Sequence, residues 1–163
     1  MAFVILCASV FVAFKINNLF MKRTVVADSD QLLPDFNFYS LDTVSFSREN
    51  LRKGEDIIVI HFDPECNYCT EEADLIVKNR EAFRSTEIVM VSENTPDKIR
   101  NFSKSFQLDK YESIHVLWDK DRQFSYLFGG STIPTTFIYN RERKLLKTYH
   151  GLAKLEALTK WLK

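Results

Sequence analysis

Two cysteines, Cys66 and Cys69, stand at Cys-x-x-Cys spacing behind a short β-branched run, Ile57–Ile60, and a turn at Asp63-Pro64. An amphipathic pattern begins directly after them. A buried strand, a turn and a thiol pair that opens a helix are typical of proteins that exchange disulfides. Free N–H groups and the positive dipole end at a helix N-terminus favour thiolate, so Cys66 is the predicted nucleophile. Cys69, one turn further on, is the predicted resolving thiol.

The same pair is also compatible with half of a zinc site or with a structural disulfide. A zinc site needs two more ligands, and no second Cys-x-x-Cys or histidine pair stands at suitable spacing. The remaining cysteine, Cys7, makes an odd total of three, which does not describe a disulfide-stapled scaffold. We therefore expect no metal and no bound cofactor other than a redox-active Cys66–Cys69 disulfide.

Acidic residues crowd the two cysteines, and they affect the expected direction of exchange. They are Asp63, Glu65, Glu71 and Glu72. Nearby negative charge disfavours a thiolate, so we expect a reductant rather than a strong oxidant. In the first turn of a helix, Glu71 and Glu72 could equally serve only to balance the helix dipole.

Four residues near the pair are candidates for tuning its chemistry. Glu65 precedes the first cysteine, and Asn67 and Tyr68 separate the two. Tyr68 could form an aromatic rim for a partner or simply pack. His61 is the nearest potential base, but its place in a strand favours a packed or capping role.

The elements around the pair alternate between strand and helix patterns, which predicts an α/β layered fold. The expected strands are Phe36–Tyr39, Thr43–Phe46, Ile57–Phe62, Glu87–Ser92, Ile114–Trp118, Thr135–Tyr139 and Leu145–His150. The expected helices are Cys66–Phe83, Pro96–Gln107, a short one ending near Phe128, and Leu152–Leu162.

The N-terminus carries an uncharged run, Ala2–Phe14, interrupted by Lys15. The run alone is too short to span a bilayer, but Ala2–Met21 is long enough if Lys15 reaches the interface. We expect residues 1–21 to be a membrane anchor or signal segment, with a buried helix as the alternative, 22–33 a linker, and 34–163 the folded domain. A single anchor in the cell membrane with an extracytoplasmic (periplasmic) domain is expected, and a cleaved, secreted form stays open. Basic residues after the run would instead place the domain in the cytoplasm.

The net charge is zero, with 22 basic and 22 acidic residues. Nucleic-acid binding would need a basic surface, and no recognition motif of that class is present. We therefore expect no nucleic-acid partner.

These motifs together resemble the thioredoxin superfamily, and within it the membrane-anchored TlpA/ResA-like (redoxin-type) thiol–disulfide oxidoreductases. Leu33–Phe36 and the hairpin after it are similar to the N-terminal extension of that family. Ile57–Cys69 resembles its active-site strand and turn, and Glu87–Trp118 its inserted helix and strand. Ile133–Phe137, which reads Ile-Pro-Thr-Thr-Phe, resembles its cis-proline loop. The resemblance covers about Leu33 to Leu162.

The resemblance implies a thioredoxin-like fold: a central mixed β-sheet flanked by helices, with an N-terminal hairpin extension and a helix–strand insertion. It implies that Pro134, preceded by Ile133, is a cis-proline beside the cysteines that leaves room for a substrate strand. Protein disulfides would be the substrates, and an upstream donor would supply electrons. The chain departs from the pattern in having Glu65 where tryptophan is common and Ile60 where thioredoxin has a buried aspartate.

Two other functions stay open at this point. A peroxiredoxin-like peroxidase needs a threonine three residues before its reactive cysteine, where this chain has Asp63 for Cys66. A non-enzymatic binding or copper-carrying module could use the two thiols as soft ligands for Cu(I).

Overall fold

The computed structural model describes residues 31–130 and 132–163 of this chain. Its centre is a seven-stranded mixed sheet with the strand order β2-β1-β5-β4-β3-β6-β7. The strands are β1 (Asn37–Tyr39), β2 (Ser45–Ser47), β3 (Asp56–His61), β4 (Thr86–Ser92), β5 (Ile114–Trp118), β6 (Thr135–Tyr139) and β7 (Leu145–His150). All seven strands expected from the sequence are present, so the predicted α/β architecture with a mixed sheet is confirmed.

The middle of the sheet is parallel and its flanks are antiparallel. β3 pairs in parallel with β4, and β4 with β5, whereas β6 runs antiparallel to β3 and β1 antiparallel to β5. Every residue of β3 and β4 is buried. Strands covered on both faces need continuous apolar runs rather than alternation, which explains the sequence of Ile57–Ile60.

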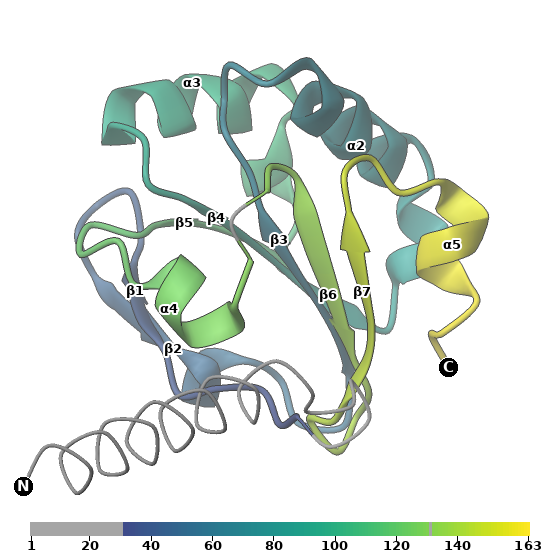
Figure 1. Cartoon of the computed structure of the whole chain (residues 1–163). Coiled ribbons are helices and arrows are strands. Elements are labelled where there is room, and N and C mark those ends of the chain that lie inside the picture. Colours follow the sequence, from purple (N-terminus) through teal and green to yellow (C-terminus); the bar gives the residue numbers. More distant parts are fainter. Residues whose placement is uncertain (1–30, 131) are drawn as a thin grey trace, which may run out of the picture.

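Helices cover both faces of this sheet (Figure 1). They are α2 (Asn67–Lys78), α3 (Pro96–Ser105), α4 (Phe124–Phe128) and α5 (Leu155–Thr159). α2, α3 and α5 pack on the face that carries Ile58 and Ile60. α4 and the N-terminal extension pack on the opposite face, against Val59 and Val89. Two apolar cores therefore hold the ends of β3 and β4 in place, and the cysteines follow β3 directly.

The helix behind the cysteines is shorter than expected, because α2 ends at Lys78 instead of continuing to Phe83. Asn79 is its C-cap: the backbone amide and the side-chain amide of Asn79 both donate to the Leu75 carbonyl, at 3.1 and 2.8 Å. A separate 3-10 turn, Arg80–Phe83, follows and still buries Phe83. α3 also ends early, before Gln107, whose φ of 54° is left-handed.

The predicted closing helix, Leu152–Leu162, is wrong in extent, since α5 covers only Leu155–Thr159. Gly151 has a φ of 84°, a conformation that favours glycine, and the chain stays extended through Lys154. Ala153 is buried in this extended stretch while Leu152 is exposed. Ala153, and not Leu152, therefore packs into the core at this point.

The folded domain includes residues just before the expected boundary at 34. Leu33 is buried against the second core, and its amide donates to the Arg143 carbonyl at 2.8 Å. The expected anchor or signal segment, residues 1–21, lies outside the described residues. Within the part of the chain that the structure describes, no helix has the length and apolar character needed to cross a bilayer.

Candidate active site

Cys66 and Cys69 lie where β3 gives way to α2. Cys66 is the N-cap residue of α2 and is half-buried, while Cys69 lies one turn into the helix and is buried. Both thiols are free in this structure. One accessible and one inaccessible sulfur give the asymmetry that a nucleophile and a resolving thiol require.

The loop between β3 and α2 holds both cysteines through the backbone of Asp63. Its carbonyl accepts a hydrogen bond from the Cys66 amide at 3.1 Å, and its own amide donates to the Cys69 sulfur at 3.5 Å. Burial raises the pKa of the Cys69 thiol, against the lowering effect of the Asp63 amide. Cys66 and Glu72 raise it further, so Cys69 is protonated at neutral pH.

The burial of Glu72 is the feature of the site that the sequence analysis did not predict. The sequence places Glu72 in the first turn of the helix, whereas in the structure it lies in the second turn of α2 and is fully buried. One carboxylate oxygen accepts a hydrogen bond from the Thr136 hydroxyl at 3.0 Å. The other has no partner at hydrogen-bonding distance among the described residues.

The physical state of Glu72 follows from this burial. Burial raises its pKa to about 7, although the Thr136 hydroxyl and the Ala153 backbone act in the opposite direction. The signal was present in the spacing, because positions three, four and seven after Cys69 share one helix face. Those positions hold Glu72, Ala73 and Ile76, all buried. The charge of Glu72 suggested an exposed position, although this spacing places the residue on the buried face of the helix.

Two other acidic residues near the pair are already partnered. The Glu65 carboxylate forms an ion pair with the Lys98 ammonium of α3 at 2.7 Å. The Asp63 carboxylate accepts from the Glu65 amide at 2.7 Å and from the Asn94 side-chain amide at 3.3 Å. The charge crowding that the sequence indicated is therefore partly neutralised by the inserted helix α3.

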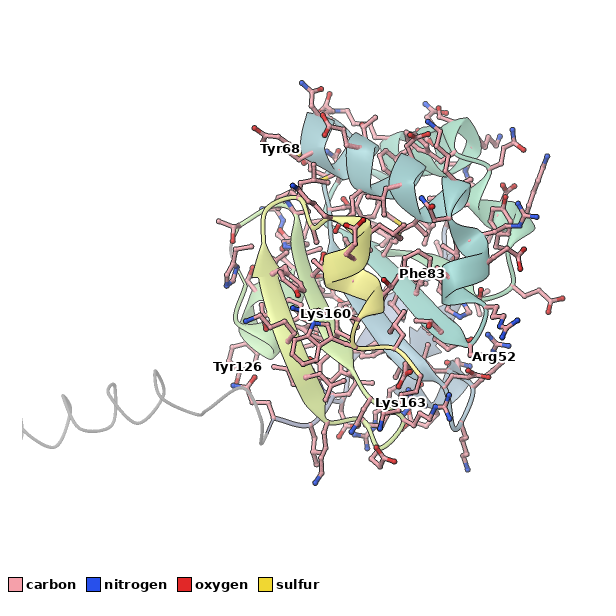
Figure 2. All side chains as sticks on the ribbon, turned by 90° about the vertical axis from the view of Figure 1, so that its right-hand side faces the viewer. Arg52, Tyr68, Phe83, Tyr126, Lys160 and Lys163 are labelled. Atoms are coloured by element: carbon pink, nitrogen blue, oxygen red, sulfur yellow. The ribbon has the colours of Figure 1, made fainter. Side chains whose placement is uncertain are left out.

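The predicted proline loop contains a cis peptide bond between Ile133 and Pro134. Pro134 is buried and its carbonyl accepts a hydrogen bond from the Gly151 amide at 2.8 Å. Ile133 is partly exposed at the end of this loop. Asn67 and Tyr68 are exposed, and Tyr68 projects outward from the start of α2 (Figure 2).

His61 lies on the other side of the sheet from Cys69. Its ring stacks on Phe124 of α4 with centroids 4.3 Å apart, in the core opposite α2. Burial lowers its pKa, against the raising effect of the Asp119 and Asp63 carboxylates. It is a packed, neutral histidine in this position.

The described residues contain no group of three or more His, Cys, Asp or Glu side chains arranged to hold a metal ion. The site brings together two thiols, of Cys66 and Cys69, and the buried carboxyl group of Glu72. Two neighbouring thiols are the groups that thiol–disulfide exchange requires.

A family model of the AhpC/TSA family matches residues 30–148, which is most of the chain. The chain belongs to the AhpC/TSA family. Over 102 residues this AhpC/TSA chain is 28% identical to "Thiol-disulfide oxidoreductase ResA" of Bacillus subtilis (strain 168), covering 61% of this chain and 55% of that protein. The chain thus spans about half the length of the curated relative it matches. The predicted similarity to ResA-like proteins is confirmed.

Solved structures confirm the fold of this AhpC/TSA chain. A thiol:disulfide interchange protein of the thioredoxin family from Chlorobium tepidum TLS aligns with a TM-score of 0.62 and 21% identity, covering 80% of this chain and 92% of that one. The exposed lipoprotein thioredoxin Etrx1 of Streptococcus pneumoniae strain TIGR4 aligns with a TM-score of 0.60 and 22% identity, covering 78% and 96%. The fold is therefore thioredoxin-like.

Proposed function

We propose that this protein is a thiol–disulfide oxidoreductase that reduces disulfides in protein partners through Cys66 and Cys69. The observation that carries the proposal is the pairing of an accessible thiol at the N-cap of α2 with a buried thiol one turn behind it. The name of the ResA relative supports the same activity.

The proposed reaction has two exchange steps. The Cys66 thiolate attacks one sulfur of the partner disulfide, forms a mixed disulfide and releases the partner's first thiolate. Cys69, after losing its proton, attacks the Cys66 sulfur and releases the second partner thiolate. Two electrons pass from the cysteine pair to the partner, both partner sulfurs end as thiols, and a Cys66–Cys69 disulfide remains. An upstream dithiol donor must then reduce that disulfide.

The second step needs a group that removes the proton from Cys69, and Glu72 is suited to it. Its carboxyl group is buried near that thiol, and its pKa of about 7 lets it exchange protons at neutral pH. Proton transfer within the buried pair avoids the cost of a charged Cys69 waiting in an apolar site. Glu72 is thus the proposed proton acceptor for the resolving step.

The proposed direction, reduction of partners, follows from what stabilises each redox state. Strong oxidants of this superfamily owe their potential to a stabilised reduced form. Here burial and the Glu72 charge destabilise the thiolate of Cys69. The reduced pair therefore gains less from ionisation, which favours giving electrons away.

The experiment compares wild type with Cys66→Ser and Cys69→Ser on a small disulfide, bis(2-hydroxyethyl) disulfide, and on a disulfide-containing protein. We expect Cys66→Ser to abolish turnover and Cys69→Ser to leave a mixed disulfide on Cys66 that mass spectrometry detects. Ala157→Ser, which adds a hydroxyl in α5 outside the cysteine pair, serves as a control. Full turnover by Cys66→Ser would contradict the proposal.

The AhpC/TSA match favours a second candidate, a thiol peroxidase. Such an enzyme oxidises its thiol to a sulfenic acid while the peroxide is reduced to water or alcohol. The absence of threonine three residues before Cys66 weighs against it. Consumption of hydrogen peroxide by the reduced protein, lost in Cys66→Ser, would establish it.

Stoichiometric Cu(I) binding without disulfide turnover would instead support a copper carrier.

The proposed location is the outer side of the cell membrane, with residues 1–21 as the anchor. The exposed lipoprotein thioredoxin among the structural relatives supports a location outside the cytoplasm. Protease added to intact cells or spheroplasts should digest the domain. If the domain is fully protected from protease until the cell membrane is broken, the domain lies in the cytoplasm.

A further inference from the structure

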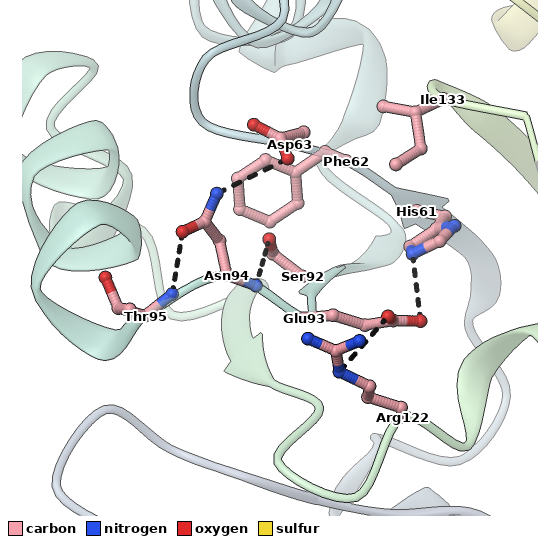
Figure 3. A pocket seen from close by; sticks show the side chains of 9 residues that line it. All are labelled: His61, Phe62, Asp63, Ser92, Glu93, Asn94, Thr95, Arg122 and Ile133. Atoms are coloured by element: carbon pink, nitrogen blue, oxygen red, sulfur yellow. Dashed lines mark hydrogen bonds and ion pairs between the residues drawn. The ribbon is translucent and has the colours of Figure 1, made fainter.

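A pocket of about 340 Å³ opens at the carboxyl ends of β3 and β4 (Figure 3). Its walls come from the end of β3, the segment after β4, the turn before α4 and the proline loop. In open α/β sheets, ligands are commonly bound outside the carboxyl ends of the strands. The volume falls within the range of about 300–1,000 Å³ typical of small-ligand sites.

The pocket reaches the redox centre through two of its lining residues, Asp63 and Ile133. The Asp63 backbone contacts both cysteines, and Ile133 precedes the cis-proline. A polypeptide joined to Cys66 by a mixed disulfide therefore passes close to the mouth of this pocket. A side chain near the partner's cysteine can enter it.

Two side chains of the pocket, His61 and Glu93, have polar atoms whose partners are distant or missing. His61 is only 4% exposed, and its Nδ1 has no hydrogen-bond partner within the described residues. Its Nε2 faces Glu93 at 3.9 Å, beyond hydrogen-bonding distance (Figure 3). The Glu93 side chain is 29% exposed, and its carboxylate lies 3.9 Å from His61 Nε2 and 4.0 Å from Arg122 Nε. Both contacts are longer than a hydrogen bond, so the carboxylate can accept from a closer donor that arrives from outside.

The charged side chains in the pocket favour a positively charged hydrogen-bond donor as its ligand. Asp63 and Glu93 supply two carboxylates, against the single cation of Arg122. The Arg122 side chain is 77% exposed and its Nε lies 4.0 Å from Glu93, which makes it a weak ion pair. Burial lowers the pKa of His61, so the imidazole is neutral.

We propose that this pocket, lined by His61, Asp63, Glu93 and Arg122, binds a basic side chain, lysine or arginine, of the substrate polypeptide and so selects partners with positive charge beside their disulfide. A lysine or arginine head group carries donors only, and it can donate to the Glu93 carboxylate, with the Asp63 carboxylate as the second negative charge in the pocket. It displaces the loosely held Arg122 towards solvent. This inference rests on the proposed disulfide exchange and names the substrate class for it.

The test uses peptides with one internal disulfide whose residues flanking the cysteines are all Lys, all Gln or all Glu. The reduced full chain is mixed with each peptide, and the second-order rate constant is divided by that for bis(2-hydroxyethyl) disulfide. This ratio cancels any change in the thiol chemistry itself. We expect the Lys peptide to exceed the Gln peptide by about tenfold, and the Glu peptide to be slowest.

Two variants and one control decide whether the pocket is responsible. Glu93→Gln should reduce the Lys-over-Gln preference to about threefold or less, and Arg122→Gln should increase it, because the competing cation is gone. Glu142→Gln removes the same charge at the exposed turn between β6 and β7, and should leave the preference as in wild type.

The failures of the two proposals can be told apart. If the wild type reduces the small disulfide but treats all three peptides alike, the pocket proposal is overturned and the exchange activity stands. Equal effects of Glu93→Gln and Glu142→Gln also overturn it, since only general electrostatics would then be at work. If the wild type does not reduce the small disulfide, the exchange activity itself is wrong.

Discussion

At the scale of single residues, Cys69 and Glu72 are two acidic groups in one buried space. Ionising either makes it harder to ionise the other, so they titrate as a coupled pair. The burial that raises both pKa values is a property of the face of α2 that carries them. The same burial that makes Glu72 a proton acceptor therefore also affects the stability of the fold.

Glu72→Gln should weaken the pH dependence of stability of the reduced protein. The pKa of Glu72 is raised to about 7 in the folded state, from an ordinary value of 4.5. Between these values the folded state binds more protons than the unfolded state, so stability falls as pH rises. Glutamine cannot titrate. Between pH 5 and pH 8 the wild type should lose on the order of 2–3 kcal/mol more unfolding free energy than the variant.

Urea denaturation of both proteins under reducing conditions at several pH values measures this difference. Glu142→Gln, at an exposed turn, is the matched control and should follow the wild type. Parallel pH profiles for wild type and Glu72→Gln would show that Glu72 does not titrate in this window. The proposed proton transfer from Cys69 would then lose its basis.

How far the site could be predicted depends on what each residue shows locally. The cysteine spacing and the apolar run before it identify the reactive pair, because that signal lies within one short stretch. The spacing from Cys69 indicates the helix face that carries Glu72, but not its hydrogen-bond partner, Thr136 of β6, which is 64 residues away. The pocket at Glu93 likewise needs four separate segments. Such long-range arrangements are not encoded in local spacing.

At the scale of elements, the N-terminal hairpin of β1 and β2 belongs to the apolar core on the α4 face of the sheet. β1 extends the sheet beyond β5, and Phe38 packs its ring against Phe124 and Phe128 of α4, with centroids 6.2 and 6.4 Å apart. The hairpin and α4 thus share one aromatic cluster on the face opposite α2. Each element depends on the other for burial.

Phe38→Ala should therefore destabilise the whole domain. Removing a fully buried phenylalanine leaves a cavity and typically costs about 3–5 kcal/mol. Urea denaturation monitored by tryptophan fluorescence gives the change. Tyr126→Ala, at an aromatic side chain of α4 that is 84% exposed, should change stability by less than about 0.5 kcal/mol. Equal, small losses in both variants would mean that the hairpin contributes nothing to the core.

Element ends were harder to predict than the elements themselves. Asn79 ends α2 through its own side chain, a local signal that the apolar periodicity concealed because Phe83 continues the same buried face. The early leucines of the last helix reproduce a helical pattern, yet the chain there is extended beside Glu72 and only later becomes α5. At the last helix, tertiary contacts outweighed propensity.

At the scale of the whole molecule, the redox state of one cysteine pair and the stability of the fold are linked by a thermodynamic cycle. If the folded protein is a better reductant than its unfolded chain, the oxidised form must be the more stable one. The disulfide closes a loop with only two residues between the cysteines, so restriction of the unfolded chain contributes little. The stability difference therefore reports the folded environment of the pair.

We expect the oxidised protein to unfold at a higher urea concentration than the reduced protein at pH 7. In the reduced form Cys69 keeps its proton in a buried site beside Glu72 and gains nothing from ionisation. A difference of about 1–3 kcal/mol would correspond to a potential roughly 20–65 mV below that of the unfolded pair. Equilibrium titrations of the folded protein and of the unfolded chain against glutathione must give the same difference in potential, because the thermodynamic cycle closes. A reduced form that is more stable than the oxidised form, as in strong oxidants, would reverse the proposed direction of electron flow.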